Sequence, residues 1–185
     1  MAVHVVVHWR ESFKPSNTAR LAVHMLTNCN LVVRGGPTPE AGRDVELALR
    51  SLDPDRTLLL YPDENAVPIE AIRDDGAGID AVTSLVVPDG TWSQTRRLVR
   101  RHEALRKMRW VRLRAQDTQY VLRRGSESGL LCTLEAIAEA LGILEGSTCK
   151  DGLMRGFATW QAQALKIRGR RGDAGPFAGR TNRGI

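Results

Sequence analysis

The chain has 185 residues, 42% of them hydrophobic, which suits one compact domain with a core of its own. Its formal net charge of +6 and pI near 9.8 favour a polyanionic partner. No apolar run approaches the roughly 20 residues that cross a bilayer, and the first residues lack the pattern of a signal peptide, so we expect a cytoplasmic protein that does not bind membranes.

Short runs of β-branched residues alternate with helical segments in the first third of the chain. Strands are predicted over residues 3–8 and 31–33, because both runs are rich in valine. A helix capped by Asn17-Thr18 runs between them to about residue 26. Residues 40–52 have the moderate amphipathicity of a further helix.

The middle of the chain repeats this alternation. Residues 57–61 form a buried-looking strand, and a short helix over residues 68–74 follows it. The apolar run 85–87 predicts the next strand, and residues 93–108 form a helix rich in arginine.

In the last third, residues 110–113 and 120–122 alternate like half-exposed strands. A helix over 133–141 is stopped by Gly142, and a final helix covers residues 147–167. The order of elements predicts an α/β fold with a mostly parallel sheet and helices on both faces.

The chain is therefore divided into a domain of residues 1–167 and a tail of residues 168–185. The tail is rich in Gly and Arg and has too few apolar residues to repay the entropy of ordering, so we expect it to be flexible. It is either a source of non-specific RNA affinity or a spacer.

Positive charge is concentrated in one stretch. Residues 93–124 hold eleven Arg and Lys residues against two acids, whereas residues 40–89 hold twelve acids against four arginines. Arginine dominates the basic stretch, and its planar guanidinium binds phosphate in a bidentate manner and stacks on bases. We interpret the stretch as a nucleic-acid contact; the alternative is a solvated helix face.

Several classes of site lack support. Cys29, Cys132 and Cys149 are odd in number and far apart, which favours neither a disulfide framework nor a zinc module and fits a reducing compartment. Phosphate-loop, dinucleotide-binding and nucleophile-elbow motifs are absent from the sequence. His8 and Glu11 are too few to hold a metal ion, so no metal is expected.

The segment 85–92 is the most informative, because an apolar strand ends there in an acidic turn that opens a helix. Ligands of α/β proteins bind at such turns, which places chemistry around Asp89. A simpler reading is local: Thr91 and Gln94 match a capping box, and Trp92 could belong to the core.

Five motifs in order resemble those of the DTW-domain family, the tRNA-uridine aminocarboxypropyltransferases. The family's signature motif is matched by Pro88-Asp89-Gly90-Thr91-Trp92-Ser93-Gln94 of this chain. The others resemble His8-Trp9-Arg10-Glu11, Asn17-Thr18-Ala19-Arg20-Leu21, Leu59-Leu60-Tyr61-Pro62, and the pair Tyr120-Val121-Leu122-Arg123-Arg124 with Leu131-Cys132-Thr133-Leu134-Glu135-Ala136. The resemblance covers roughly residues 3 to 165.

The resemblance implies a SPOUT-like catalytic domain with a trefoil knot in its C-terminal part, an exception to the rule against threaded chains. It also implies that S-adenosylmethionine binds at the ends of the strands. By position in the motifs, the residues that line its site are Leu60, Tyr61, Pro62, Pro88, Gly90, Thr91, Trp92, Leu131, Cys132 and Thr133.

The implied reaction moves the 3-amino-3-carboxypropyl group of S-adenosylmethionine to N3 of a uridine in RNA and releases methylthioadenosine. Such a transfer needs a base for the N3 proton, for which Asp89 is the candidate and Glu135 the alternative. The RNA, a tRNA or else a ribosomal RNA, would contact Arg96, Arg97, Arg100 and Arg101, while Arg20 and Arg123 could bind RNA or the methionine carboxylate.

The sequence departs from the family pattern at several positions. The cysteine cluster usual before the first motif is missing, so we expect any RNA contact by a zinc module to be absent or replaced. Trp9 stands where Pro is usual, Cys132 replaces a Ser, and no Pro follows Arg124. A SPOUT-type RNA methyltransferase and a non-catalytic RNA-binding module remain as alternatives, and we expect a monomer.

Overall fold

The computed structural model describes residues 1–36, 43–74, 81–114, 118–120 and 131–173. Six strands form one sheet in the order β2-β1-β5-β3-β6-β4, and each neighbouring pair is parallel. The strands are β1 (Ala2–His8), β2 (Cys29–Arg34), β3 (Thr57–Leu60), β4 (Val67–Pro68), β5 (Ser84–Asp89) and β6 (Arg109–Arg112). Their carboxyl ends therefore meet at one edge of the sheet, where α/β proteins bind ligands.

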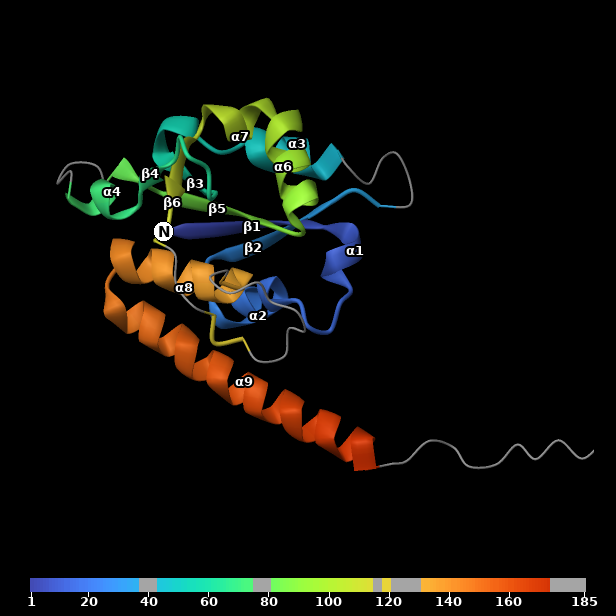
Figure 1. Cartoon of the computed structure of the whole chain (residues 1–185). Coiled ribbons are helices and arrows are strands. Elements are labelled where there is room, and N and C mark those ends of the chain that lie inside the picture. The colour runs from blue at the N-terminus through green and yellow to red at the C-terminus, as the bar shows by residue number, and fades with distance from the viewer. Residues whose placement is uncertain (37–42, 75–80, 115–117, 121–130, 174–185) are drawn as a thin grey trace, which may run out of the picture.

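Helices cover both faces of the sheet, which confirms the predicted α/β architecture (Figure 1). On one face lie α3 (Arg43–Arg50), α6 (Trp92–Arg101) and α7 (Glu103–Lys107), and on the other α2 (Thr18–Met25) and α8 (Thr133–Leu144). The long helix α9 (Ser147–Asp173) packs outside α8. Short segments complete the described elements: α1 (Trp9–Ser12), a 3-10 turn (Pro54–Arg56) and α4 (Glu70–Asp74).

Alternate strand residues serve the two faces. Val5 and Val87 belong to the core cluster under α2 and α8, whereas Val6 and Val86 belong to the cluster under α3, α6 and α7. Because side chains alternate along a strand, fully buried strands read as continuous apolar runs. By the same alternation Leu60, the last residue of β3, faces α2 and α8, and so does Asp89, the last residue of β5, which lies two residues after Val87.

The arginine-rich helix is two helices and not the single one predicted. His102 is extended, with φ −102° and ψ 112°, and separates α6 from α7. Its Nδ1 lies 2.8 Å from Glu46 Oε2 of α3. The helix is interrupted at His102, where this contact is made. Neither Pro nor Gly stands near His102 to mark the interruption in the sequence.

The predicted stop at Gly142 was also wrong. Helix α8 continues to Leu144, which is buried, and the chain turns at Gly146 with φ +103°. Leu144 lies one turn beyond the buried Leu141, so it extends the apolar face of the helix past Gly142.

The end of the last helix was predicted too early, because α9 runs to Asp173 rather than to residue 167. Residues 174–185 of the predicted tail lie outside the described residues, so the division into domain and tail stays a prediction. A knot in the C-terminal part would involve the connection from β6 to α8, of which 115–117 and 121–130 lie outside the described residues. The knot likewise stays a prediction.

The strand expected at 120–122 is not seen at Tyr120, the one of its residues that the structure describes. Its hydroxyl donates to the Ser16 carbonyl at 2.8 Å, and its ring lies 5.6 Å from that of Phe157, between ring centroids. Tyr120 thus ties its segment to the loop before α2 through its side chain. Across the described helices, none is long and apolar enough to span a membrane.

Candidate active site

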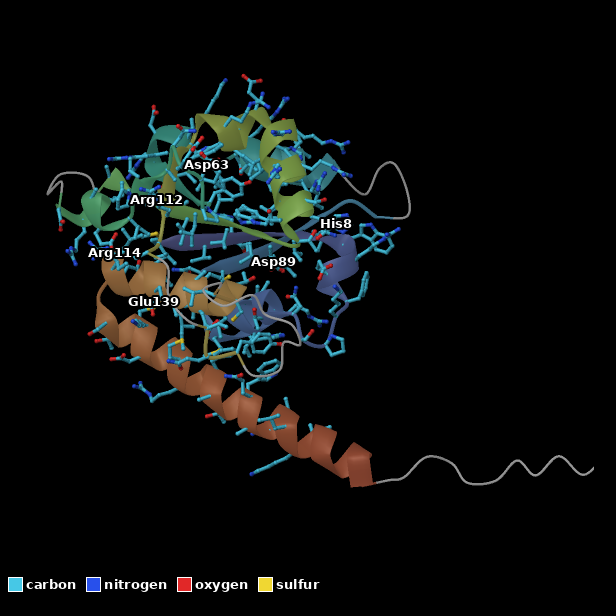
Figure 2. All side chains as sticks on the ribbon, viewed as in Figure 1. His8, Asp63, Asp89, Arg112, Arg114 and Glu139 are labelled. Atoms are coloured by element: carbon cyan, nitrogen blue, oxygen red, sulfur yellow. The ribbon has the colours of Figure 1, made fainter. Side chains whose placement is uncertain are left out.

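Asp89 is the last residue of β5, and its carboxylate lies at the beginnings of two helices. Asn17, the N-cap of α2, donates from Nδ2 to Asp89 Oδ2 at 2.7 Å. Thr133, the first residue of α8, donates from Oγ1 to Asp89 Oδ1. Figure 2 shows Asp89 between the sheet and these helices. The two hydrogen bonds fix the orientation of the carboxylate.

The turn after Asp89 has the predicted capping box. The Thr91 N–H donates to Gln94 Oε1 at 2.7 Å, and the Gln94 N–H donates to Thr91 Oγ1 at 3.4 Å. Trp92 begins α6 and remains 49% exposed, so it is not a core residue. The cap therefore fixes the turn and leaves the indole at the surface.

Gly90 is required by this turn, and its replacement by Ala is expected to destabilise the protein. Its φ is +154°, and an added Cβ would lie 2.8 Å from Gln94 Oε1. The strain should lower the free energy of unfolding by about 1–3 kcal/mol, or the melting temperature by roughly 2–12 °C. Gly152→Ala is the matched control, because an added Cβ there meets nothing within 4 Å. Equal melting of the two variants would contradict this role.

Glu135 lies two residues after Thr133 and is 2% exposed. Its oxygens accept hydrogen bonds from Thr118 Oγ1 at 2.6 Å, the Gln119 N–H at 2.5 Å and the Cys132 N–H at 2.7 Å. The last bond is the Glu half of a capping box on α8. Glu135 thus holds together residues on both sides of the segment 121–130.

A pocket of about 400 Å³ opens at the ends of β3 and β6 beside α6. Its lining comprises Tyr61, Pro62, Asp63, Glu64, Trp92, Arg96, Val99, Arg100 and Trp110. The Tyr61 ring meets Trp92 and Trp110 edge to face, with centroids 5.9 and 5.6 Å apart. Burial raises the pKa of the Tyr61 hydroxyl, and Arg96 opposes that rise through its charge and a hydrogen bond. The pocket is aromatic with a charged rim.

The pocket and Asp89 lie on opposite faces of the sheet edge. Tyr61, Val99 and Trp110 belong to the core cluster under α6, whereas the helices that contact Asp89 cover the other cluster. Only the turn Gly90-Thr91 separates Asp89 from Trp92 in the chain. A ligand that reaches both must therefore pass around the end of β5.

The other residues expected at the cofactor site are distributed along this edge. Leu60 points into the core cluster under α8, and Pro88 pairs with Val6 in the sheet. Leu131 is half-buried, and burial raises the pKa of the Cys132 thiol to about 12, so that thiol is neutral. These residues shape the edge around Asp89.

The arginines expected to bind RNA do not form one group. Arg96 and Arg100 line the pocket. The charges of Arg97 and Arg101 instead lower the pKa of Arg34 at the end of β2. Arg20 is exposed in the first turn of α2. Arg123 lies outside the described residues.

Sequence reasoning missed several residues of the site. Asn17 was expected only to cap α2, and Trp110 only to belong to a strand, yet Asn17 binds Asp89 and Trp110 lines the pocket. Like Glu64 and Val99, Asp63 was not among the expected site residues and also lines the pocket. Its place directly after the Tyr61-Pro62 strand end was the available signal.

Comparisons with known proteins agree with this arrangement. The DTW-domain model matches residues 1–165. The chain is 37% identical over 116 residues to "tRNA-uridine aminocarboxypropyltransferase 2" of Drosophila melanogaster. The matched residues are 62% of this chain and 44% of that protein. It is 32% identical over 155 residues to the Mus musculus protein of the same name, covering 83% and 51%. The chain spans about half the length of these curated relatives.

A solved structure has the same fold at low identity. It is described as the "Structure of the SAM-dependent rRNA:acp-transferase Tsr3 from Vulcanisaeta distributa". The TM-score is 0.52 at 18% identity, and the match covers 92% of this chain and 80% of that one. The family match spans nearly the whole described chain, and its motifs coincide with the carboxyl edge of the sheet. This protein belongs to the DTW-domain family.

Proposed function

We propose that this protein transfers the 3-amino-3-carboxypropyl group of S-adenosylmethionine to N3 of a uridine in tRNA. The observation that carries the proposal is Asp89, a half-buried carboxylate at the sheet edge that Asn17 and Thr133 hold between two helix N-termini. The relatives named for this activity support it, and their names favour tRNA over ribosomal RNA. We further propose that the protein acts as a monomer in the cytoplasm.

The residues at the edge fit S-adenosylmethionine. A pocket of about 400 Å³ is of the size that holds small ligands. Tyr61, Trp92 and Trp110 offer aromatic rings for the adenine, and the carboxylates of Asp63 and Glu64 can accept hydrogen bonds from ribose hydroxyls. In this proposal Leu131 and Thr133 line the path from the pocket to Asp89, and Arg20 binds the methionine carboxylate.

When bound, S-adenosylmethionine supplies an aminocarboxypropyl group activated by the sulfonium; its transfer to N3 releases methylthioadenosine and one proton. The role of the chain is then to orient N3 and to accept that proton. Asp89 is the residue we assign to the proton, because its carboxylate lies at the end of β5 and its two hydrogen bonds hold it in one orientation. Glu135 is assigned a positioning role, because its oxygens hold the backbone at residues 119 and 132.

The RNA must present the uridine out of its stack for N3 to reach Asp89. Arg96 and Arg100 border the pocket and are the arginines we assign to a phosphate beside the target nucleotide. Both residues are exposed on α6: Arg96 lies one turn after Trp92, and Arg100 lies in the last turn of the helix.

The test is the coproduct of a reaction between the protein, bulk tRNA and S-adenosylmethionine. The proposal expects methylthioadenosine in an amount equal to the modified nucleoside, measured by liquid chromatography. S-adenosylhomocysteine would instead identify a methyltransferase that uses the same edge. Neither product, with tRNA binding retained, would identify a binding module.

A further inference from the structure

The four arginines that follow Trp92 divide into two pairs by helical spacing. Arg96 and Arg100 are four residues apart and line the pocket. Arg97 and Arg101 have the same spacing, which places them together on the adjacent flank of α6. Both act electrostatically on Arg34, the last residue of β2, so the second pair faces the ends of β1 and β2.

Positive charge accumulates at these strand ends. His8 and Arg34 are register partners in β1 and β2. Burial lowers the pKa of Arg34, and Arg101 and Arg97 lower it further. Burial also lowers the pKa of His8; Arg34, Arg10 and Arg97 add to this, and Glu11 opposes it. The positive charge of Arg97 therefore lowers the pKa of both His8 and Arg34.

No counter-charge for this cluster is found among the side chains that the structure describes, which do not include those of residues 37–44. The ion pairs among these described side chains join other residues, and none of their carboxylates pairs with Arg34, Arg97 or Arg101. Glu11, the acid whose charge acts on His8, is paired with Lys14, with 2.6 Å between Lys14 Nζ and Glu11 Oε2. Like charges gathered without a counter-charge repel one another, and a bound polyanion relieves the repulsion.

Aromatic side chains border the same cluster. Phe13 is 74% exposed and meets the Trp9 ring edge to face at 6.4 Å, and the Arg10 guanidinium carbon lies 5.4 Å from the Trp9 ring centre. Trp9 Cδ1 lies 3.2 Å from where Gly35 would carry a Cβ, so the indole lies against the end of β2. Figure 1 shows α1 and the start of α6 at the same end of the sheet.

We propose that Arg34, Arg97 and Arg101, with Trp9 and Phe13, form a second RNA contact, which we call the strand-end surface. It binds the sugar-phosphate backbone of a single-stranded part of the substrate next to the target uridine, and one unpaired base stacks on Phe13. Arginine forks match phosphate, and exposed aromatic rings stack bases of any sequence. This inference rests on the proposed RNA substrate and assigns Trp9, Phe13 and Arg34 a role in holding it.

The test measures binding of bulk tRNA over a salt series without S-adenosylmethionine. Arg97→Ala/Arg101→Ala should weaken binding about tenfold or more and make the slope of log affinity against log salt shallower by about 2. Phe13→Ala should weaken binding about fivefold or more with the slope unchanged. The control Arg155→Ala/Lys166→Ala removes the same charge from exposed positions on α9 and should stay within about twofold. Melting curves show that each variant is folded.

Equal losses in the two double variants would overturn the strand-end surface, because net charge alone would then explain binding. Wild-type affinity in Phe13→Ala and Arg97→Ala/Arg101→Ala would overturn it too, as would binding of an acidic protein in place of tRNA. If the chain modifies tRNA but these variants bind normally, the surface fails and the proposed function stands. If they lose binding but wild type transfers no group, the proposed function fails and the surface stands.

Discussion

Asp89→Asn is expected to lower the rate of aminocarboxypropyl transfer by about 10²–10⁴-fold, the usual contribution of a positioned base. The amide keeps the size of the side chain but cannot take the N3 proton. Single-turnover rates at saturating S-adenosylmethionine measure the effect on chemistry. S-adenosylmethionine should raise the melting temperature of Asp89→Asn as it does that of the wild type, because binding stabilises the folded protein and the pocket beside α6 is unchanged.

Two further variants separate loss of the base from loss of structure. Asp89→Glu keeps the charge but moves it by one methylene away from Asn17 and Thr133, and it should also be slow. Asp151→Asn, an exposed acid on α9, should react like wild type. Near-wild-type rates in Asp89→Asn would show that another group takes the proton.

Glu135→Ala is expected to have the largest effect on stability. It leaves the hydroxyl of Thr118 and the backbone N–H groups of Gln119 and Cys132 without their acceptor. The cost should be about 3–5 kcal/mol of unfolding free energy, since a hydrogen bond to a charged group contributes on the order of 1.5–3 kcal/mol, and of the three donors only the Cys132 N–H is fully buried. The melting temperature should then fall by roughly 6–20 °C.

Glu139→Ala provides the matched control on the same helix. Glu139 lies one turn further along α8 and pairs with the partly exposed Lys150 at 2.7 Å, so its loss should cost at most about 1 kcal/mol. Glu135→Gln should lie between, because it keeps one acceptor oxygen and turns a donor toward the backbone N–H groups. If Glu135→Ala melted like Glu139→Ala, the positioning role of Glu135 would be wrong.

The sheet and the turn at Asp89 could be predicted from the sequence because their signals are local. Valine and leucine runs identify the buried strands, and Thr91 with Gln94 identifies the cap. The order of the family motifs also indicated that Asp89 and Thr133, 44 residues apart, belong to one site, and a hydrogen bond joins them.

Features that depend on partners distant in the chain could not be predicted. The break at His102 coincides with a contact to Glu46, 56 residues away, and no local residue marks it. The second role of Asn17 depends on Asp89, 72 residues away. The separation of the α6 arginines into two pairs follows from helical spacing, but what each pair faces depends on how α6 lies over the sheet.

The most direct measurement is the mass of the nucleosides of tRNA incubated with the purified protein and S-adenosylmethionine. The account predicts a uridine heavier by one aminocarboxypropyl group, attached at N3, which forms about 10²–10⁴-fold more slowly with Asp89→Asn. A methylated nucleoside, or tRNA left unmodified by a protein that binds both tRNA and S-adenosylmethionine, would contradict it.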